Sequence, residues 1–159
     1  MRIGIGYDIH RLVRGRALTL GGIAITSEWG LEGHSDADVL LHAISDALLG
    51  ALALGDLGQH FPDTDPSYGG IASTKLLEQV IKMVHDHAYR LHNVDAVVIA
   101  QRPHLASHIF AIRQNIATLL TTELSSVSVK AKTAESLGAL GRGEGIAVHA
   151  VCILSPYGQ

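Results

Sequence analysis

Hydrophobic and polar positions along the chain follow two periods, and each period predicts a different kind of element. Residues 2–8 alternate in strand fashion. Two later segments, 73–87 and 105–124, repeat apolar residues every three or four positions and are predicted to be amphipathic helices. Three short apolar runs are predicted to be strands, at 94–100, 127–132 and 146–154. The second half of the chain therefore mixes helices with strands.

Glycine and proline mark the turns between these elements. Gly21-Gly22 separates two short apolar segments, 17–20 and 23–26, an arrangement typical of a β-hairpin with a tight primed turn. Residues 55–66 are too rich in Gly, Pro and Asp for regular structure, so a long loop is expected there. Long loops in compact domains are usually functional or mobile.

The stretch His34–Asp46 is the most informative part of the chain. Ser35 followed three residues later by Asp38, just before an apolar run, resembles a helix-opening capping box. A helix is therefore predicted to start here and to end near Gly50 or continue to Leu54.

Polar residues at helical spacing line one face of this predicted helix. Asp38, His42 and Asp46 recur every four residues, beside faces that are otherwise apolar. Ionisable groups at the margin of a core are costly unless they are paired, bound to a metal or facing a cleft. Asp38 is assigned either to capping the helix or to orienting a metal-bound histidine.

A candidate metal site combines this helix with the first strand. Asp8 and His10 would project from the same side of the strand, and His42 would add a second imidazole. This ligand set suits zinc with an open position, or an iron oxygenase triad, or it is three unrelated solvated side chains. The similarly spaced His85 and His87 lie on a polar helix face and are interpreted as solvated.

Composition describes an ordinary globular protein. The 159 residues are 47% hydrophobic and 17% charged, enough for one domain with a substantial core. The formal net charge of -3 leaves no electrostatic footprint for nucleic acid. Cys152 is the one cysteine and is expected in the core, and neither a secretory signal nor a membrane span is expected. We therefore expect a cytoplasmic protein without membrane or nucleic-acid partners.

The elements together indicate the fold class. The sequence contains no internal repeat, linker or low-complexity segment. One domain spanning residues 1–159 is predicted, of the α/β class in its α+β form, with helices packed on a mixed sheet.

A second polar cluster follows one of the predicted strands. Within Lys130–Glu135, cations and hydroxyls suit phosphate oxygens, and Glu135 suits a hard cation such as Mg²⁺ or Mn²⁺. A charged strand end that faces water is an equally good interpretation of these residues alone. Gly141–Gly145 lacks the context of a phosphate-binding loop and is interpreted first as a turn.

Taken together, six motifs resemble the 2-C-methyl-D-erythritol 2,4-cyclodiphosphate synthase family. They are Gly6-Tyr7-Asp8-Ile9-His10, His34-Ser35-Asp36-Ala37-Asp38-Val39, Gly55-Asp56-Leu57-Gly58, Phe61-Pro62-Asp63-Thr64-Asp65, Lys130-Ala131-Lys132-Thr133 and Gly141-Arg142-Gly143-Glu144-Gly145. The resemblance runs in order over about residues 1–155. It implies a homotrimer whose active sites lie between neighbouring subunits, in the cytosol or a plastid, serving the non-mevalonate isoprenoid pathway.

The resemblance also implies a reaction and its metals. It makes Asp8, His10 and His42 zinc ligands and Glu135 the contact to Mg²⁺ or Mn²⁺. The 2-phosphate of 4-diphosphocytidyl-2-C-methyl-D-erythritol 2-phosphate would attack the β-phosphorus and expel CMP. The metals would align and neutralise the two phosphoryl groups, so no protein nucleophile is needed.

Further site residues follow from the same resemblance. His34 and Thr133 are implied to position phosphates and stabilise the transition state. The implied substrate contacts are Ser35, Asp46, Asp56, Leu57, Gly58, Phe61, Pro62, Asp63, Thr64, Asp65, Lys132 and Ala139. The residues implied to surround the cytosine in the neighbouring subunit are Ala100, Gln101, Arg102, Pro103, His104, Leu105 and Ala106. Ser35 is implied to contact a phosphate, and 56–65 to hold the methylerythritol moiety.

Three positions bear on how closely the chain follows the family. Ala37 replaces the family's glycine in what is predicted to be the first turn of a helix, and Ala139 stands where an aromatic residue is common. Arg142 matches a residue that lines the trimer's central cavity, where isoprenoid diphosphates are proposed to bind. A non-enzymatic protein that binds zinc and cytidine nucleotides is the alternative if the two alanines mark a degenerate site.

Overall fold

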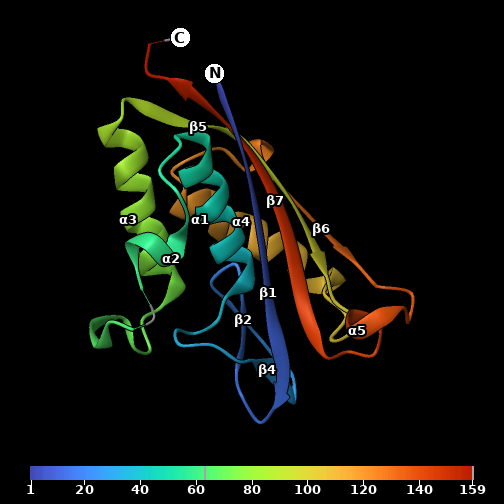
Figure 1. The fold of residues 1–159 in the computed structure, drawn as a ribbon. Coiled ribbons are helices and arrows are strands. Elements are labelled where there is room, and N and C mark those ends of the chain that lie inside the picture. The colour runs from blue at the N-terminus through green and yellow to red at the C-terminus, as the bar shows by residue number, and fades with distance from the viewer. Residues whose placement is uncertain (63, 159) are drawn as a thin grey trace.

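A five-stranded mixed sheet forms the centre of the molecule. The computed structural model describes residues 1–62 and 64–158. The strands lie in the order β4-β1-β7-β5-β6, in which β5 and β6 are parallel and the other neighbours antiparallel (Figure 1). Their bounds are β1 (Arg2–Arg14), β4 (Trp29–Leu31), β5 (Tyr89–Ile99), β6 (Val127–Lys132) and β7 (Gly145–Pro156). The predicted mixed sheet is confirmed, as is the predicted range of β6.

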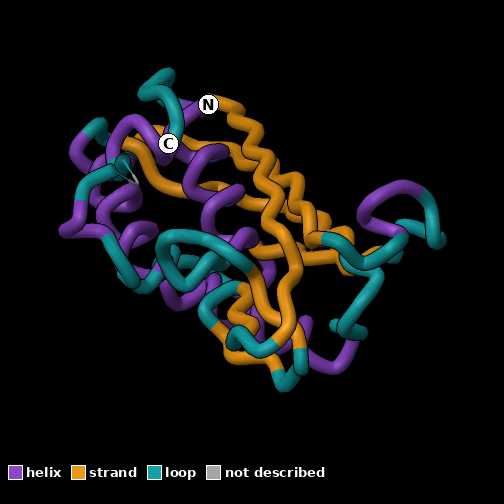
Figure 2. Tube along the Cα trace, turned by 60° about the horizontal axis from the view of Figure 1, so that its bottom comes forward, coloured by secondary structure: helices purple, strands orange, loops and turns teal. Residues whose placement is uncertain are grey.

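The three longer helices lie on one side of this sheet, as Figures 1 and 2 show together. They are α1 (Val39–Ala51), α3 (Ser73–Asp86) and α4 (Ile109–Leu119). Short helices are α2 (Leu57–His60), α5 (Gly138–Gly141) and the 3₁₀ turns at Pro66–Tyr68, Ala106–His108 and Leu124–Ser126. The result is a single-domain α+β fold. Among the described residues, no helix has the length and apolar character needed to cross a membrane.

The predicted hairpin forms as a separate two-stranded sheet. Strands β2 (Leu18–Leu20) and β3 (Ile23–Ile25) pair through Leu20 and Ile23. Gly21 and Gly22 connect them with φ values of +61° and +75°. Positive φ at both central residues is what a primed turn requires, so the prediction is confirmed.

Several predicted boundaries are wrong because tertiary pairing sets them. β1 continues beyond residue 8 because β7 pairs with it as far as Arg11 and β4 pairs with Leu12 to Arg14. β5 starts at Tyr89 because it pairs with the last residues of β7. The predicted helix over 105–124 is shorter at both ends, since 3₁₀ turns flank it and Thr121 adopts a φ of 51°. Residues 55–66 include α2, so they are not irregular throughout.

The sheet has one covered face and one bare face. Between Ile3 and Leu12 of β1, the even-numbered residues face the helices, while the odd-numbered side chains are exposed. The exposed face carries large apolar side chains on β1 and its neighbour β7. They are Ile3, Ile5, Tyr7, Ile9 and Val151. Exposed apolar patches of this kind mark surfaces that contact other molecules.

Helix α1 packs directly on the backbone of β1. A Cβ atom built on Gly6 would lie 1.9 Å from the carbonyl oxygen of Ala43, and one on Gly4 would lie 1.8 Å from that of Ala47. Both distances are shorter than any non-bonded contact, so only glycine fits at these two positions. The strand that carries Asp8 and His10 is thereby held against the helix that carries His42.

We expect Gly6→Ala to lower the free energy of unfolding by about 3 kcal/mol or more, because the new methyl group meets helix backbone that has no room to move. Urea unfolding followed by circular dichroism measures this. Gly50→Ala is the matched control. Gly50 lies on α1, the helix that packs against Gly6, and a Cβ atom on Gly50 would meet only the Ile5 carbonyl oxygen at 3.7 Å. That control should stabilise the protein by about 0.5–1 kcal/mol. Equal effects of the two substitutions would contradict the close packing.

Candidate metal centre

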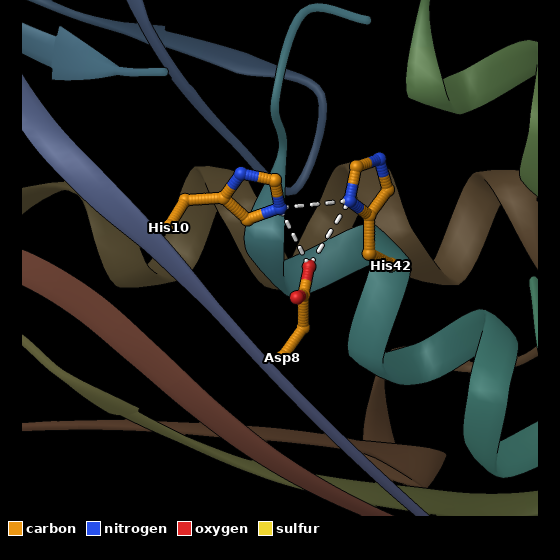
Figure 3. A group of neighbouring side chains, drawn as sticks. All are labelled: Asp8, His10 and His42. Carbon is orange, nitrogen blue, oxygen red and sulfur yellow. Dashed lines mark hydrogen bonds and ion pairs between the residues drawn. The ribbon is translucent and has the colours of Figure 1, made fainter. Parts of the chain in front are cut away.

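Three potential metal ligands converge where β1 meets α1. Asp8 and His10 project from the strand and His42 from the helix, and their side chains point toward one another (Figure 3). Asp8 Oδ2 lies 2.8 Å from His10 Nε2 and 3.1 Å from His42 Nδ1, and the two ring nitrogens are 3.3 Å apart. One carboxylate oxygen and two imidazole nitrogens at these separations can hold a divalent metal ion.

The His10 ring is oriented by a backbone carbonyl. His10 Nδ1 lies 2.8 Å from the Glu32 carbonyl oxygen. Because a carbonyl only accepts hydrogen bonds, Nδ1 carries the hydrogen and Nε2 is left to face Asp8 and His42. This is the second contact that metal-binding histidines commonly make. The arrangement therefore fits a cation at the centre of the three groups.

The ionisation of the cluster reflects the same convergence. Burial raises the pKa of Asp8, but hydrogen bonds that the protonated rings of His10 and His42 donate outweigh burial and hold this pKa well below its usual range. Burial lowers the pKa of His10, but the hydrogen bonds to Asp8 and Glu32 outweigh it and leave this pKa raised. The cluster thus attracts positive charge, and a proton on His10 Nε2 would compete with a metal ion for the same position.

Asp38 caps helix α1 and is not one of the three converging ligands. Its Oδ1 accepts from Leu41 N at 3.1 Å and from Gly21 N at 3.0 Å, and its Oδ2 accepts from Gly22 N at 2.6 Å. Of its two predicted roles, capping is confirmed. Asp38 is fully buried and faces the β2–β3 turn, so the prediction that it shares a polar face with His42 and Asp46 is wrong.

The helix therefore begins later than the sequence suggested. Val39, not Ser35, starts α1, and Ser35 Oγ accepts from Ala37 N at 3.0 Å in the preceding turn. Ala37 lies in that turn with a φ of 57°, not in the first turn of the helix. Glycine, which the family resemblance implies at this position, adopts this left-handed conformation without strain.

A cavity of about 440 Å³ opens beside the three ligands. Six of the predicted site residues line it in addition to the ligands: His34, Ser35, Asp46, Leu57, Gly58 and Phe61. Gly33, Tyr68, Ile71 and Leu76 line it as well and were not predicted. Tyr68 meets Phe61 edge to face at 5.5 Å. Its aromatic type in a Pro- and Gly-rich stretch was the signal that could have identified it.

Acidic residues near the cavity differ in what they contact. Asp46 Oδ1 accepts from Leu57 N at 2.7 Å, and burial raises the pKa of this carboxyl. Asp56 is exposed and caps α2 through Gln59 N at 2.9 Å. Asp56 does not line the cavity. The predicted contacts that follow α2, namely Pro62, Thr64 and Asp65, do not line it either. Asp63 lies outside the described residues.

The other predicted contacts form a second group at the carboxyl ends of β5 and β6. A hollow of about 120 Å³ there is lined by Ala100, Pro103, His104, Leu105, Ala106, Lys132 and Thr133. Gln101 Oε1 accepts from Ser136 N at 3.4 Å, and Arg102 lies over the Trp29 ring at 4.8 Å. None of these residues lines the cavity beside Asp8 within the described part of the chain.

Glu135 and the segment after it stand apart from the Asp8 cluster. The Thr133 hydroxyl donates a hydrogen bond to Glu135 Oε1. Ala139 is exposed on α5, and Arg142 Nε donates to Glu144 Oε1 at 2.6 Å. Gly141 ends α5 against the backbone of Ser136, where a Cβ atom would come within 2.2 Å. This agrees with the interpretation of Gly141–Gly145 as a turn.

Comparisons with known proteins cover almost the whole chain. A model described as the YgbB family matches residues 1–155. The 2-C-methyl-D-erythritol 2,4-cyclodiphosphate synthase of Desulforamulus reducens is 60% identical over 154 residues, which are 97% of this chain and 98% of that relative.

Solved structures agree with the sequence comparison. A 2C-methyl-D-erythritol-2,4-cyclodiphosphate synthase in a CDP-bound form superposes with a TM-score of 0.91 and 37% identity, covering 97% of this chain and all of the other. The bifunctional IspDF of Campylobacter jejuni gives a TM-score of 0.95 at 40% identity. That match covers 98% of this chain but 42% of the larger protein, so this chain corresponds to less than half of it.

The buried Asp38 carboxyl predicts how stability depends on pH. Burial raises its pKa from 3.8 to about 6, although three backbone N–H groups favour the charged form. Between these values the folded state binds more protons than the unfolded state. The contribution of Asp38 to the free energy of unfolding therefore falls as the pH rises from about 4 to about 6, by up to about 3 kcal/mol.

Urea unfolding of the wild type and of Asp38→Asn at several pH values tests this, because the amide does not titrate. The advantage of the wild type over Asp38→Asn should be larger near pH 4 than near pH 7. Parallel stability profiles for the two proteins would contradict the raised pKa.

Proposed function

Because this chain belongs to the YgbB family, we propose that it is a 2-C-methyl-D-erythritol 2,4-cyclodiphosphate synthase of the non-mevalonate isoprenoid pathway, acting in the cytoplasm. It converts 4-diphosphocytidyl-2-C-methyl-D-erythritol 2-phosphate to the cyclic 2,4-diphosphate and CMP. One observation carries the assignment: in a chain 60% identical to such a synthase, Asp8, His10 and His42 converge beside a cavity of about 440 Å³.

The reaction is an intramolecular phosphoryl transfer. An oxygen of the 2-phosphate forms a bond to the β-phosphorus, and the bond from that phosphorus to the bridging oxygen breaks. CMP leaves with the electron pair. The barrier is mainly electrostatic because two anionic groups must meet, so the protein's task is to position and neutralise them. Family membership favours this phosphoryl chemistry over the iron oxygenase alternative for the same ligands.

Zinc is the proposed ion for Asp8, His10 and His42, and Mg²⁺ or Mn²⁺ for Glu135. The donor set supports zinc, since two imidazoles and one carboxylate leave a fourth position open. The exposed Glu135 carboxylate supports a hard cation that phosphate oxygens also bind. Such cations neutralise phosphoryl charge and hold two phosphates in line.

Residues around the cavity are assigned to the phosphate groups and to the methylerythritol moiety of the substrate. His34 and Ser35, next to the metal ligands, would donate hydrogen bonds to phosphate oxygens, and Ser35 has its hydroxyl hydrogen available. Asp46 would accept from a substrate hydroxyl, while the side chains of Leu57 and Phe61 offer apolar contacts for the carbon skeleton. Asp56, Pro62, Thr64 and Asp65 are proposed to help hold this moiety, as is Asp63, which lies outside the described residues.

The remaining substrate contacts support a homotrimer with sites between subunits. The cytosine segment 100–106, with Lys132 and Thr133, lines its own hollow, separate from the cavity beside Asp8 in the described chain. A neighbouring subunit that supplies the second group would bring both groups to one substrate. The bare apolar face of β1 and β7 supplies a surface for such contacts. CDP in a related solved structure supports a cytidine nucleotide as part of the substrate.

Two exposed residues, Ala139 on α5 and Arg142 at its end, are also assigned to ligand binding. Ala139 is assigned to the substrate, without the stacking that an aromatic residue would add. Arg142 extends from the end of α5, and its guanidinium is proposed to hold an isoprenoid diphosphate in the cavity at the trimer axis.

Phosphorus NMR on the protein, its substrate and Mg²⁺ tests the function directly. CMP and a cyclic diphosphate should appear with the wild type, and their formation should stop when a chelator removes zinc. His42→Ala should abolish turnover, because the substitution removes one ligand. Substrate left unchanged by zinc-loaded trimers would support the alternative of a binding protein without turnover.

Mixing two inactive variants tests whether the site spans subunits. His42→Ala and Thr133→Ala alter different groups of site residues. Randomly mixed trimers of the two should regain about one quarter of wild-type sites, because each site takes one group from each neighbour. Mixtures made by co-expression and assayed for CMP release measure this. No gain over the separate variants would place both groups of a site in one chain.

A further inference from the structure

We propose that Asp36 and Ser73 are positioning residues for the metal site: they form a hydrogen-bond relay that holds His42 with Nδ1 free to bind the metal. The inference rests on the proposed metal-dependent function. It concerns residues that contact neither the metal position nor the cavity, since neither side chain lines the cavity beside Asp8. Their role would be exerted entirely through His42.

The first step of the relay joins Asp36 to Ser73 through two hydrogen bonds. Ser73 N donates to Asp36 Oδ2 at 3.1 Å, and the Ser73 hydroxyl donates to Asp36 Oδ1. Ser73 is the first residue of α3 and is fully buried. A carboxylate only accepts hydrogen bonds, so the one hydroxyl hydrogen of Ser73 is committed to Asp36.

The second step joins Ser73 to the far nitrogen of His42. Ser73 Oγ lies 2.9 Å from His42 Nε2. Since the hydroxyl hydrogen points to Asp36, Oγ must accept here and Nε2 must carry the hydrogen. A neutral imidazole has one N–H, so the lone pair is on Nδ1. That nitrogen is the one that faces Asp8 and His10.

A second hydroxyl near the same nitrogen does not set the tautomer. Ser35 Oγ lies 3.3 Å from His42 Nε2, farther than Ser73 Oγ, and accepts from Ala37 N. No carboxylate holds its hydrogen, so Ser35 can either donate or accept. Ser73 has no such freedom, because Asp36 holds both its N–H and its O–H.

Asp36 has a structural role as well, and the test must separate the two. The residue before α3, Ala72, provides no side-chain cap, and Asp36 supplies the missing acceptor at Ser73 N. Losing this cap would lower stability without changing the tautomer of His42. Metal affinity and the ring tautomer are therefore the informative measurements, and turnover is not.

The experiment compares Ser73→Ala and Asp36→Asn with Ser45→Ala in the full-length protein. Ser45 is a matched control: it is buried on the same helix as His42, but its hydroxyl donates to the Leu41 carbonyl oxygen. In Asp36→Asn the new amide can donate to Ser73 Oγ, which frees the hydroxyl to donate to His42 Nε2 and favours the wrong tautomer.

Competition with a chromophoric chelator gives the affinity for Zn²⁺. We expect both relay variants to bind Zn²⁺ about 10- to 100-fold more weakly than the wild type, and Ser45→Ala to bind it like the wild type. Nitrogen NMR of the metal-free protein, at a pH where the imidazoles are neutral, should show the hydrogen of His42 on Nε2 in the wild type. Both relay variants should show a mixture of tautomers.

Two results would overturn the inference. One is wild-type Zn²⁺ affinity in both relay variants; the other is a His42 hydrogen on Nδ1 in the wild type. Either could occur while turnover stays zinc-dependent, so the proposed function would survive. Failure of the wild type to bind Zn²⁺ would overturn both. If Ser73→Ala does not fold, Asp36→Asn and the wild-type spectrum still decide between these outcomes.

Discussion

The contact between helix α1 and strand β1 is the constraint on which the rest of the molecule depends. Gly4 and Gly6 leave no side chain between the two elements, so the helix carbonyls of Ala43 and Ala47 lie where a Cβ would be. This proximity brings a ligand on the helix within hydrogen-bond distance of two ligands on the strand. It also explains why small residues dominate this interface: bulkier ones would separate the ligands.

Hydrogen bonds to the backbone and to buried side chains then orient the helix start and the two histidine rings that the packing brings together. Asp38 ties the start of α1 to the β2–β3 turn through three backbone N–H groups. The Glu32 carbonyl orients His10, and in the proposed relay Asp36 and Ser73 do the same for His42. Three electron pairs directed at one point repel one another unless a cation lies between them. The centre is thus built for positive charge.

One chain provides two separate parts of the proposed site. The cavity beside the metal ligands is lined from the loops and helices on the covered side of the sheet, and the hollow at residues 100–106 lies at the ends of β5 and β6. The face of the sheet that no helix covers carries exposed apolar side chains on β1 and β7. Both features are explained by one proposal, in which copies of the chain associate through this face and complete each other's sites.

Patterns in the sequence were sufficient to predict the features that depend on residues close together in the chain. Alternation along β1 placed Asp8 and His10 on one side of a strand, because this spacing sets the direction of each side chain, and with His42 they made a candidate metal site. The same residues alone also fitted three unrelated solvated side chains, and the family motifs favoured the metal site. Gly21-Gly22 predicted its turn for a similar reason. The family motifs added the proposed identities of more distant site residues.

Only the tertiary structure decided what depends on partners far away in the chain. The ends of β1 and β5 follow from their pairing with β4 and β7, and the Asp38 carboxylate accepts hydrogen bonds from the glycine turn. Ser73 meets Asp36 and His42 from more than thirty positions away, and no periodicity encodes such a contact. Local spacing fixes the direction of a side chain, whereas its hydrogen-bond partner depends on packing between elements.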